Sequence, residues 1–218
     1  MTYKNTLKHL MISTSLVSAS LISTISSSHA QIDLSTFDAT QGYKIAAAGP
    51  VPSGPSNVGG FIVEPIQDFN GDGRPDLVIG SRKGEAYILH VTGAAPALID
   101  LGVNDPSQKT TVVGSGFDLG TQVGSADINN DGLGDAFFLQ PSTRSIYVIY
   151  GRTGGYASNI DTSTLSAGST GFVITHPNLD TRSDIKSAGD INNDGVEDFA
   201  IGVPSANTSA GVVYILYG

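Results

Sequence analysis

A nine-residue pattern of acidic and amide side chains occurs three times in this 218-residue chain. The copies read DFNGDGRPD at 68–76, DINNDGLGD at 127–135 and DINNDGVED at 190–198. Their starting points are separated by 59 (127 − 68) and 63 (190 − 127) residues. A near-constant period of this length indicates a repeat architecture, in which each repeat folds into a similar unit.

The side chains at alternate positions of each copy are suited to a hard divalent cation. Positions 1, 3, 5 and 9 are Asp, Asn, Asp and Asp, and position 7 varies, as expected if it supplies only its backbone carbonyl. Ca²⁺ takes about six to eight oxygen ligands in flexible geometry. The sequence therefore predicts about three calcium ions, each with a structural role. The predicted ligands are Asp68, Asn70, Asp72, Arg74 and Asp76; Asp127, Asn129, Asp131, Leu133 and Asp135; and Asp190, Asn192, Asp194, Val196 and Asp198.

The residues between these ligands permit the chain to curl. A tight loop needs positive φ angles, which Gly adopts freely and Asn next most readily. Position 6 is Gly in every copy, and position 4 is Gly or Asn. The same residue types fill ordinary turns, but a plain turn gives no reason for Asp at position 9 each time. An EF-hand loop would carry a carboxylate at position 12, where this chain has Ile79, Phe138 and Ile201.

The segments that must position these loops are expected to be β-strands. Short apolar runs bounded by turn residues recur, and no stretch shows sustained helical periodicity, which is typical of an all-β chain. Two strands follow each loop, one precedes it, and an outer strand is expected earlier still, near 42–45, 111–113 and 171–174. Four antiparallel strands in about sixty residues correspond to one blade of a β-propeller.

Two further features repeat with the loops. Tyr87, Tyr147 and Tyr214 recur at matched places in the last strand of each copy, and we expect them to pack between sheets. Outside the loops, the hexapeptide IDLSTF at 32–37 is similar to IDTSTL at 160–165. The repeat therefore extends beyond the loops and their flanking strands.

With these motifs in place, the chain resembles the FG-GAP repeat of the integrin alpha-chain propeller and its bacterial relatives. The third copy is most similar, with SAGD at 187–190 before the loop and IGVP at 201–204 at the Gly-Ala-Pro position. The first two copies depart there, with Gly80-Ser81 and Gln140-Pro141. The resemblance covers nearly all of residues 31–218 and implies repeats at 31–95, 96–153 and 154–218. Family propellers have seven blades, so three imply an incomplete propeller, with self-association or further blades expected.

The first thirty residues are expected to be an export signal. Lys4 and Lys8 precede a modestly apolar run at 10–25, and Ser28-His29-Ala30 resembles a cleavage site. An uncleaved anchor is the alternative reading. The chain has no cysteine and a formal net charge of −9. Without a basic cluster, this charge argues against nucleic acid and against anionic membranes as partners. We therefore expect a secreted or cell-surface protein, with the periplasm as an alternative location.

The residues expected after signal removal show no catalytic pattern. Only His90 and His176 remain as histidines, and the chain has no Gly-x-Ser-x-Gly elbow and no P-loop. Glu197 lies at position 8 of the third loop, where its side chain is expected to point away from the ion. We expect a non-catalytic calcium-binding propeller module, and the resemblance implies cell adhesion or binding of an extracellular protein or glycan. A carbohydrate-binding propeller and an accessory domain or fragment of a larger exported enzyme remain alternatives.

Overall fold

The computed structural model describes residues 44–46, 61–81, 84–91, 98–103, 105–156, 159–165 and 169–218. The predicted export signal at 1–30 lies outside these residues, as do residues 31–43 and 47–60. The chain divides into two compact units, and the second consists of residues 45–92 and 100–218. Two short strands, β1 (Lys44–Ala46) and β5 (Leu98–Asp100), fall where the sequence passes from one unit to the other.

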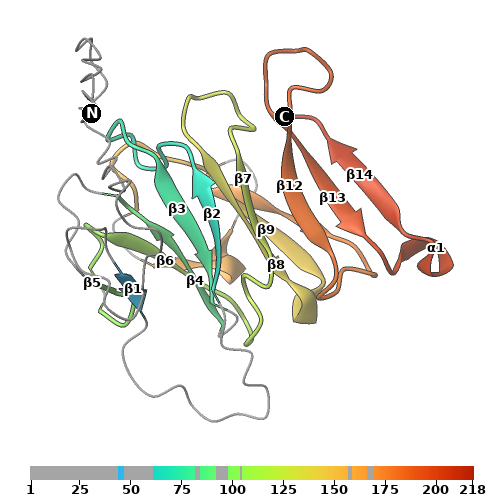
Figure 1. The fold of residues 1–218 in the computed structure, drawn as a ribbon, viewed down its shortest axis with the longest axis horizontal. Coiled ribbons are helices and arrows are strands. Elements are labelled where there is room, and N and C mark those ends of the chain that lie inside the picture. The colour runs from blue at the N-terminus through green and yellow to red at the C-terminus, as the bar shows by residue number, and fades with distance from the viewer. Residues whose placement is uncertain are drawn as a thin grey trace, which may run out of the picture. The chain divides into compact units, whose positions relative to one another are not determined.

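The second unit contains three mainly antiparallel sheets that follow one another along the chain (Figure 1). We call them the first, second and third blade. The first blade has the order β10-β6-β4-β3-β2, with strands β2 (Ile62–Ile66), β3 (Asp76–Gly80), β4 (Glu85–Leu89), β6 (Lys109–Val113) and β10 (Ile160–Asp161). The second has the order β11-β9-β8-β7, with strands β7 (Val123–Ala126), β8 (Asp135–Gln140), β9 (Ser145–Ile149) and β11 (Gly171–Thr175). The third contains β12 (Asp184–Gly189), β13 (Asp198–Val203) and β14 (Val212–Leu216).

Helical structure is minor in the described part of the chain. Two 3₁₀ turns, η2 (Pro141–Thr143) and η3 (Thr162–Thr164), and the four-residue helix α1 (Ala206–Ser209) are assigned. No helix among the described residues is long and apolar enough to cross a membrane. The predicted all-β fold with propeller-type blades is therefore confirmed, and the three blades form an incomplete propeller.

The predicted position of the outer strand in each blade is wrong. We expected the strand near 111–113 to share a blade with the loop that follows it, but β6 pairs with β4 of the first blade. Likewise, β11 pairs with β9 of the second blade and not with the third. In the first and second blades, the fourth strand is thus supplied by the segment that leads into the next blade. The repeat period alone cannot reveal this offset, because shifting the boundary of a periodic pattern leaves the pattern unchanged.

Two clusters of buried apolar side chains hold the blades together. The first lies between the first and second blades and includes Ile66, Val78 and Phe138. The second lies between the second and third blades, where the rings of Phe137 and Phe199 are 4.8 Å apart. Each such large apolar side chain contributes roughly 1.5–3 kcal/mol on burial. In the second blade, β8 and β9 direct alternate side chains into the two clusters, so this blade buries apolar side chains against both of its neighbours.

The first strands of the three blades lie close to one another. β7 contacts both β2 and β12. The Ser125 hydroxyl on β7 donates to the Pro65 carbonyl on β2 at 2.8 Å. An ion pair between Lys186 and Glu64 joins β12 to β2 directly. The loops that follow these strands are consequently brought together at one end of the blades.

The repeated tyrosines lie at one register position, as their spacing predicted. Tyr87, Tyr147 and Tyr214 occupy matched places opposite the second strand of their blades. The first two are buried, and Tyr147 belongs to the cluster between the first and second blades. Tyr214 is partly exposed. Packing between sheets is therefore confirmed for Tyr147, whereas Tyr87 is buried but belongs to neither of the two clusters between blades.

Candidate metal-binding loops

Each nine-residue motif connects the first strand of a blade to the second. Position 9 is the first residue of the second strand in all three blades, at Asp76, Asp135 and Asp198. The predicted bends are confirmed, since positions 4 and 6 have positive φ in every copy. These residues are Gly71 (75°), Asn130 (55°) and Asn193 (61°) at position 4, and Gly73 (84°), Gly132 (85°) and Gly195 (92°) at position 6. The three loops therefore share one backbone conformation.

The carboxylate at position 1 is drawn into the loop by two backbone donors. In the third loop, Asp190 Oδ1 accepts from the N–H of Asp194 at 3.0 Å, and Oδ2 accepts from the N–H of Gly195 at 2.9 Å. The corresponding bonds occur in the first and second loops. Position 1 thus organises the backbone that carries the later candidate ligands.

Positions 3 and 5 are linked to each other and to the loop backbone. In the second loop, Asn129 Oδ1 accepts from the N–H of Asp131 at 3.1 Å. The Asn129 amide donates to Asp131 Oδ2 at 3.0 Å, while Asp131 Oδ1 accepts from the N–H of Leu133 at 2.9 Å. The same contacts recur in the other two loops. The side chains at positions 1, 3 and 5 are consequently held around the same stretch of backbone.

The carboxylate at position 9 is buried and anchors the blade. Asp135 Oδ2 accepts from the N–H of Ile128, at position 2 of its own loop, at 3.0 Å. Its Oδ1 accepts from the N–H of Gly151, directly after the third strand, at 2.8 Å. Asp76 and Asp198 make the corresponding pairs of bonds, with Phe69 and Val91 and with Ile191 and Gly218. Position 9 therefore ties the loop to the end of the third strand in every blade.

The position 9 carboxylate of the second loop is also electrostatically unusual. The pKa of Asp135 is raised to about 7, mainly by burial and to a smaller extent by repulsion from the Asp131 and Asp127 carboxylates. The hydrogen bonds from Gly151 and Ile128 act in the opposite direction. The contributions of Asp131 and Asp127 indicate that the three carboxylates repel one another, and a bound cation would relieve this repulsion.

The donor chemistry of the loops fits a calcium ion. A carboxylate has about four lone-pair sites, and each accepted hydrogen bond uses one. The bonds to backbone N–H groups therefore leave acceptor capacity at positions 1, 3, 5 and 9. In the part of the chain that the structure describes, however, no three His, Asp or Glu side chains already form a metal-type cluster. Asn at position 3 and the carbonyl at position 7 (Arg74, Leu133, Val196) would have to complete the shell.

Neighbouring blades contact one another at these loops. The Phe69 carbonyl of the first loop accepts from Arg152 N–H at 2.8 Å, and the Asn70 carbonyl accepts from Gly154 N–H at 2.7 Å. Both donors follow the third strand of the second blade. The Glu197 carboxylate of the third loop accepts from the N–H of Asp127 in the second loop at 3.0 Å. These contacts could not be predicted from the repeated motif, since they depend on which loops become neighbours.

The two histidines in the described part of the chain, His90 and His176, lie outside the candidate metal-binding loops. The buried His90 contacts Thr110 through Nε2 at 3.0 Å, and its Nδ1 lies 3.8 Å from Asp76 Oδ2, beyond hydrogen-bond distance. His176 Nδ1 accepts from the N–H of Asn178, so its neutral ring carries the proton on Nε2 and donates to the Tyr214 hydroxyl at 3.0 Å.

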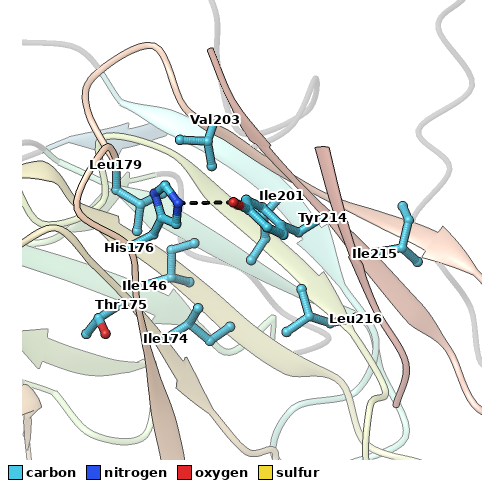
Figure 2. A pocket seen from close by; sticks show the side chains of 10 residues that line it. All are labelled: Ile146, Ile174, Thr175, His176, Leu179, Ile201, Val203, Tyr214, Ile215 and Leu216. Carbon is cyan, nitrogen blue, oxygen red and sulfur yellow. Dashed lines mark hydrogen bonds between the residues drawn. The ribbon is translucent and has the colours of Figure 1, made fainter. Parts of the chain in front are cut away.

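A cavity of about 220 Å³ lies between the second and third blades. Figure 2 shows the His176–Tyr214 hydrogen bond beside the apolar side chains that line it, among them Ile146, Ile174 and Leu179. Ile215 lies apart from this pair. The cavity offers few polar groups, and its lining is typical of imperfect packing between two sheets.

Two known repeat families match separate parts of the described chain. The FG-GAP-like repeat family matches residues 68–138, from the first metal loop through most of β8. The FG-GAP repeat family matches residues 187–216, which include the third loop, β13 and β14. No curated protein matches this chain in sequence.

Proposed function

Because this chain belongs to the FG-GAP repeat family, whose repeats form modules of β-propeller type, we propose that it is a calcium-stabilised, non-catalytic binding module. Its ligand is an extracellular protein or a glycan, and adhesion is the role that such a ligand implies. The observation that carries the calcium proposal is the threefold recurrence of one loop geometry. In all three loops the oxygens of positions 1, 3 and 5 are held by the same backbone donors.

Calcium would stabilise the blades through charge compensation. Each loop concentrates three aspartates in nine residues, and carboxylates held close together repel one another. A divalent cation at the centre of the loop converts this repulsion into attraction and supplies a structural link in a chain that has no disulfides. The residues that would hold the ion are those at positions 1, 3, 5 and 9 and the position 7 carbonyl.

The ions would act beyond their own loops. Each loop joins two strands of its blade, and the Asp127 N–H of the second loop also donates to the Glu197 carboxylate of the neighbouring blade. Fixing the loop backbone therefore fixes contacts between blades as well. We expect the bound ions to hold the module in one conformation, and the ions take no part in a chemical reaction.

Calcium titration of the full chain tests this proposal. Calorimetry should give about three ions per chain with dissociation constants in the range of about 10⁻⁴–10⁻³ M that extracellular modules show. At free calcium ten times the dissociation constant, each site would stabilise the folded state by roughly 1.4 kcal/mol, so a chelator should lower the melting temperature. A melting curve that is the same in calcium and in chelator, with no calorimetric signal, would contradict the proposal.

The binding role is supported by a hollow of about 320 Å³ among the first strands. Gln67, Ser125 and Glu197 contribute polar groups to its lining. Binding of the calcium-loaded chain to a glycan array and to immobilised extracellular proteins tests this role. Gln67→Ala should weaken any binding at this hollow, and Phe117→Ala, at an exposed side chain elsewhere, should leave it unchanged. Failure to bind in either format would contradict the binding role while leaving the calcium proposal intact.

A further inference from the structure

The first loop differs from the other two at position 4. This position is Gly71 in the first loop, whereas it is Asn130 in the second and Asn193 in the third. Asn70-Gly71 is consequently the one Asn-Gly pair in the sequence. Position 4 has positive φ in all three loops, and Asn adopts this conformation as well as Gly does. The backbone conformation therefore does not explain why the first loop carries a glycine.

Packing against the second blade explains it. A Cβ atom on Gly71 would lie 3.0 Å from Thr153 Cα and 3.1 Å from Thr153 Oγ1. Thr153 lies between the two residues whose N–H groups donate to the carbonyls at positions 2 and 3 of the first loop. The segment that covers this loop thus leaves little room for a side chain at position 4. The Asn-Gly pair is a consequence of how the first two blades pack.

An Asn that precedes Gly is open to one reaction of the backbone. The Gly nitrogen attacks the Asn Cγ atom, since Gly has no Cβ to shield that nitrogen. A bond forms between the two atoms, the bond from Cγ to the amide nitrogen breaks, and ammonia leaves with the proton of the peptide N–H. The product is a five-membered cyclic imide, which water opens at either of its two carbonyls. The net reaction converts an amide and water into an acid and ammonia, without an oxidant or a reductant.

The structure leaves the reacting atoms of the first loop accessible and weakly restrained. Asn70 is partly exposed and Gly71 is exposed, so water reaches both residues. Among the described residues, no acceptor binds the Gly71 N–H. Asn70 Nδ2 lies 3.5 Å from Asp72 Oδ2, whereas the corresponding contacts in the second and third loops are 3.0 Å and 2.7 Å. The side-chain amide that must turn toward the next nitrogen is therefore held least firmly in the first loop.

Solvent exposure alone would rank the three loops in the opposite order. Asn129 and Asn192 are exposed, whereas Asn70 is only partly exposed. Both of the exposed residues are followed by Asn, whose side chain shields the nitrogen that would attack. A reaction limited by access of water would be faster in the second and third loops. A reaction limited by attack of the next nitrogen would be faster in the first.

We infer that Asn70 is a site of spontaneous deamidation, selected among the three loops by the glycine that follows it. The aspartyl product gives the first loop a fourth carboxylate. The isoaspartyl product adds one atom to the backbone between positions 3 and 4, which shifts the Asp72 and Gly73 N–H groups away from the Asp68 carboxylate that accepts from them. The first loop therefore changes chemically with the age of the chain. The effect on metal affinity rests on the proposed calcium site.

Peptide mapping of the full chain by mass spectrometry tests this inference. The folded chain is incubated in chelator, near neutral pH and well below its melting temperature, and the three loops are followed over time. Deamidation should be at least about tenfold faster at Asn70 than at Asn129 or Asn192, because only Asn70 precedes a residue without a Cβ. Both the aspartyl and the isoaspartyl product should form, whereas direct hydrolysis of the amide gives only the first. Similar rates in the three loops, or no isoaspartyl product at Asn70, would overturn the inference.

A substitution in the second loop provides a matched gain-of-reaction variant. Asn130→Gly creates the same pair there, and Gly adopts the positive φ of this position freely. Deamidation at Asn129 should rise at least about tenfold, because the attacking nitrogen is no longer shielded. Asn130→Ala keeps a Cβ and is the control, so Asn129 should react near its wild-type rate in that variant. An unchanged rate in Asn130→Gly, or an equal rise in Asn130→Ala, would overturn the role assigned to the glycine.

A parallel incubation in saturating calcium separates this inference from the proposed function. An ion bound to Asn70 Oδ1 would hold the side chain away from the Gly71 nitrogen, so deamidation should slow several-fold. Selective deamidation at one rate in calcium and in chelator would support the modification site and contradict Asn70 as a calcium ligand. An Asn70 that stays intact in both would overturn the modification site, and calorimetric titration would still decide the calcium proposal. Asn70→Asp reproduces the aspartyl product and should bind calcium more tightly at the first loop, because affinity rises with ligand charge.

Discussion

The Glu197 carboxylate accepts a hydrogen bond from the backbone N–H of Asp127 at 3.0 Å, although the two residues are 70 positions apart. This bond joins the third metal loop to the second. It also gives Glu197 a partner that is not a metal ion, in agreement with its place at position 8 of the motif.

Replacing Glu197 should therefore affect stability and leave calcium binding unchanged. Glu197→Ala removes one hydrogen bond from a charged acceptor, which is worth about 1.5–3 kcal/mol and less at a partly exposed site. We expect a destabilisation of about 1 kcal/mol in chemical denaturation, with Glu197→Gln retaining part of the bond. If Glu197→Ala weakened calcium binding as much as Asp194→Ala does, the proposed ligand positions would be wrong.

Substitutions within the second loop should rank by ligand charge. Asp131→Ala removes a carboxylate, whereas Asn129→Ala removes a neutral amide oxygen, so the first should weaken calcium binding by roughly tenfold more than the second. Leu133→Ala is the matched control, because position 7 is expected to contribute only its carbonyl. Calorimetric titration measures all three, and equal effects of Asp131→Ala and Asn129→Ala would contradict the ranking.

The anchoring role of position 9 predicts a loss of stability that does not depend on calcium. Asp135→Ala leaves the buried N–H groups of Ile128 and Gly151 without their acceptor, at a cost of about 1–3 kcal/mol each. Unfolding in chelator should show most of this loss. Asp131→Ala should destabilise the chain mainly when calcium is present, so an Asp135→Ala chain as stable as the wild type in chelator would argue against the anchor.

A surface cluster around Asp180 predicts a small pH effect. Hydrogen bonds from Ser205 and Arg182 lower the pKa of Asp180 from 3.8 to about 2. A carboxylate whose pKa is lower in the folded state stabilises that state above its unfolded pKa, and the stabilisation is lost as the pH falls from about 4 to about 2. Asp180→Asn should lower the free energy of unfolding at pH 6 by less than about 1 kcal/mol. The melting temperature should fall slightly as a result. The difference should vanish near pH 2, and a difference that persists there would contradict this assignment.

The sequence predicted the local features of the loops because local residue types determine them. Gly73 or Asn130 can be identified as bends without knowledge of any neighbour, since positive φ is a property of the residue itself. The anchoring bond from Gly151 to Asp135 could not be identified in this way, because it depends on where the third strand ends in space. The pairing of β6 with β4 was missed for the same reason, and the role of Glu197 requires the neighbouring blade.

The offset of the fourth strand has a consequence for how such a chain can change in length during evolution. Each sixty-residue segment ends one blade and begins the next, since β6 and β11 each complete the preceding blade. Duplication of one such segment therefore inserts a blade already joined to both neighbours, with no unpaired strand left at the insertion. A deletion whose ends coincide with the borders of a folded blade would instead remove the fourth strand of one blade and leave the fourth strand of another without its pairing partner. Only cuts made in phase with the sequence repeat preserve the remaining blades.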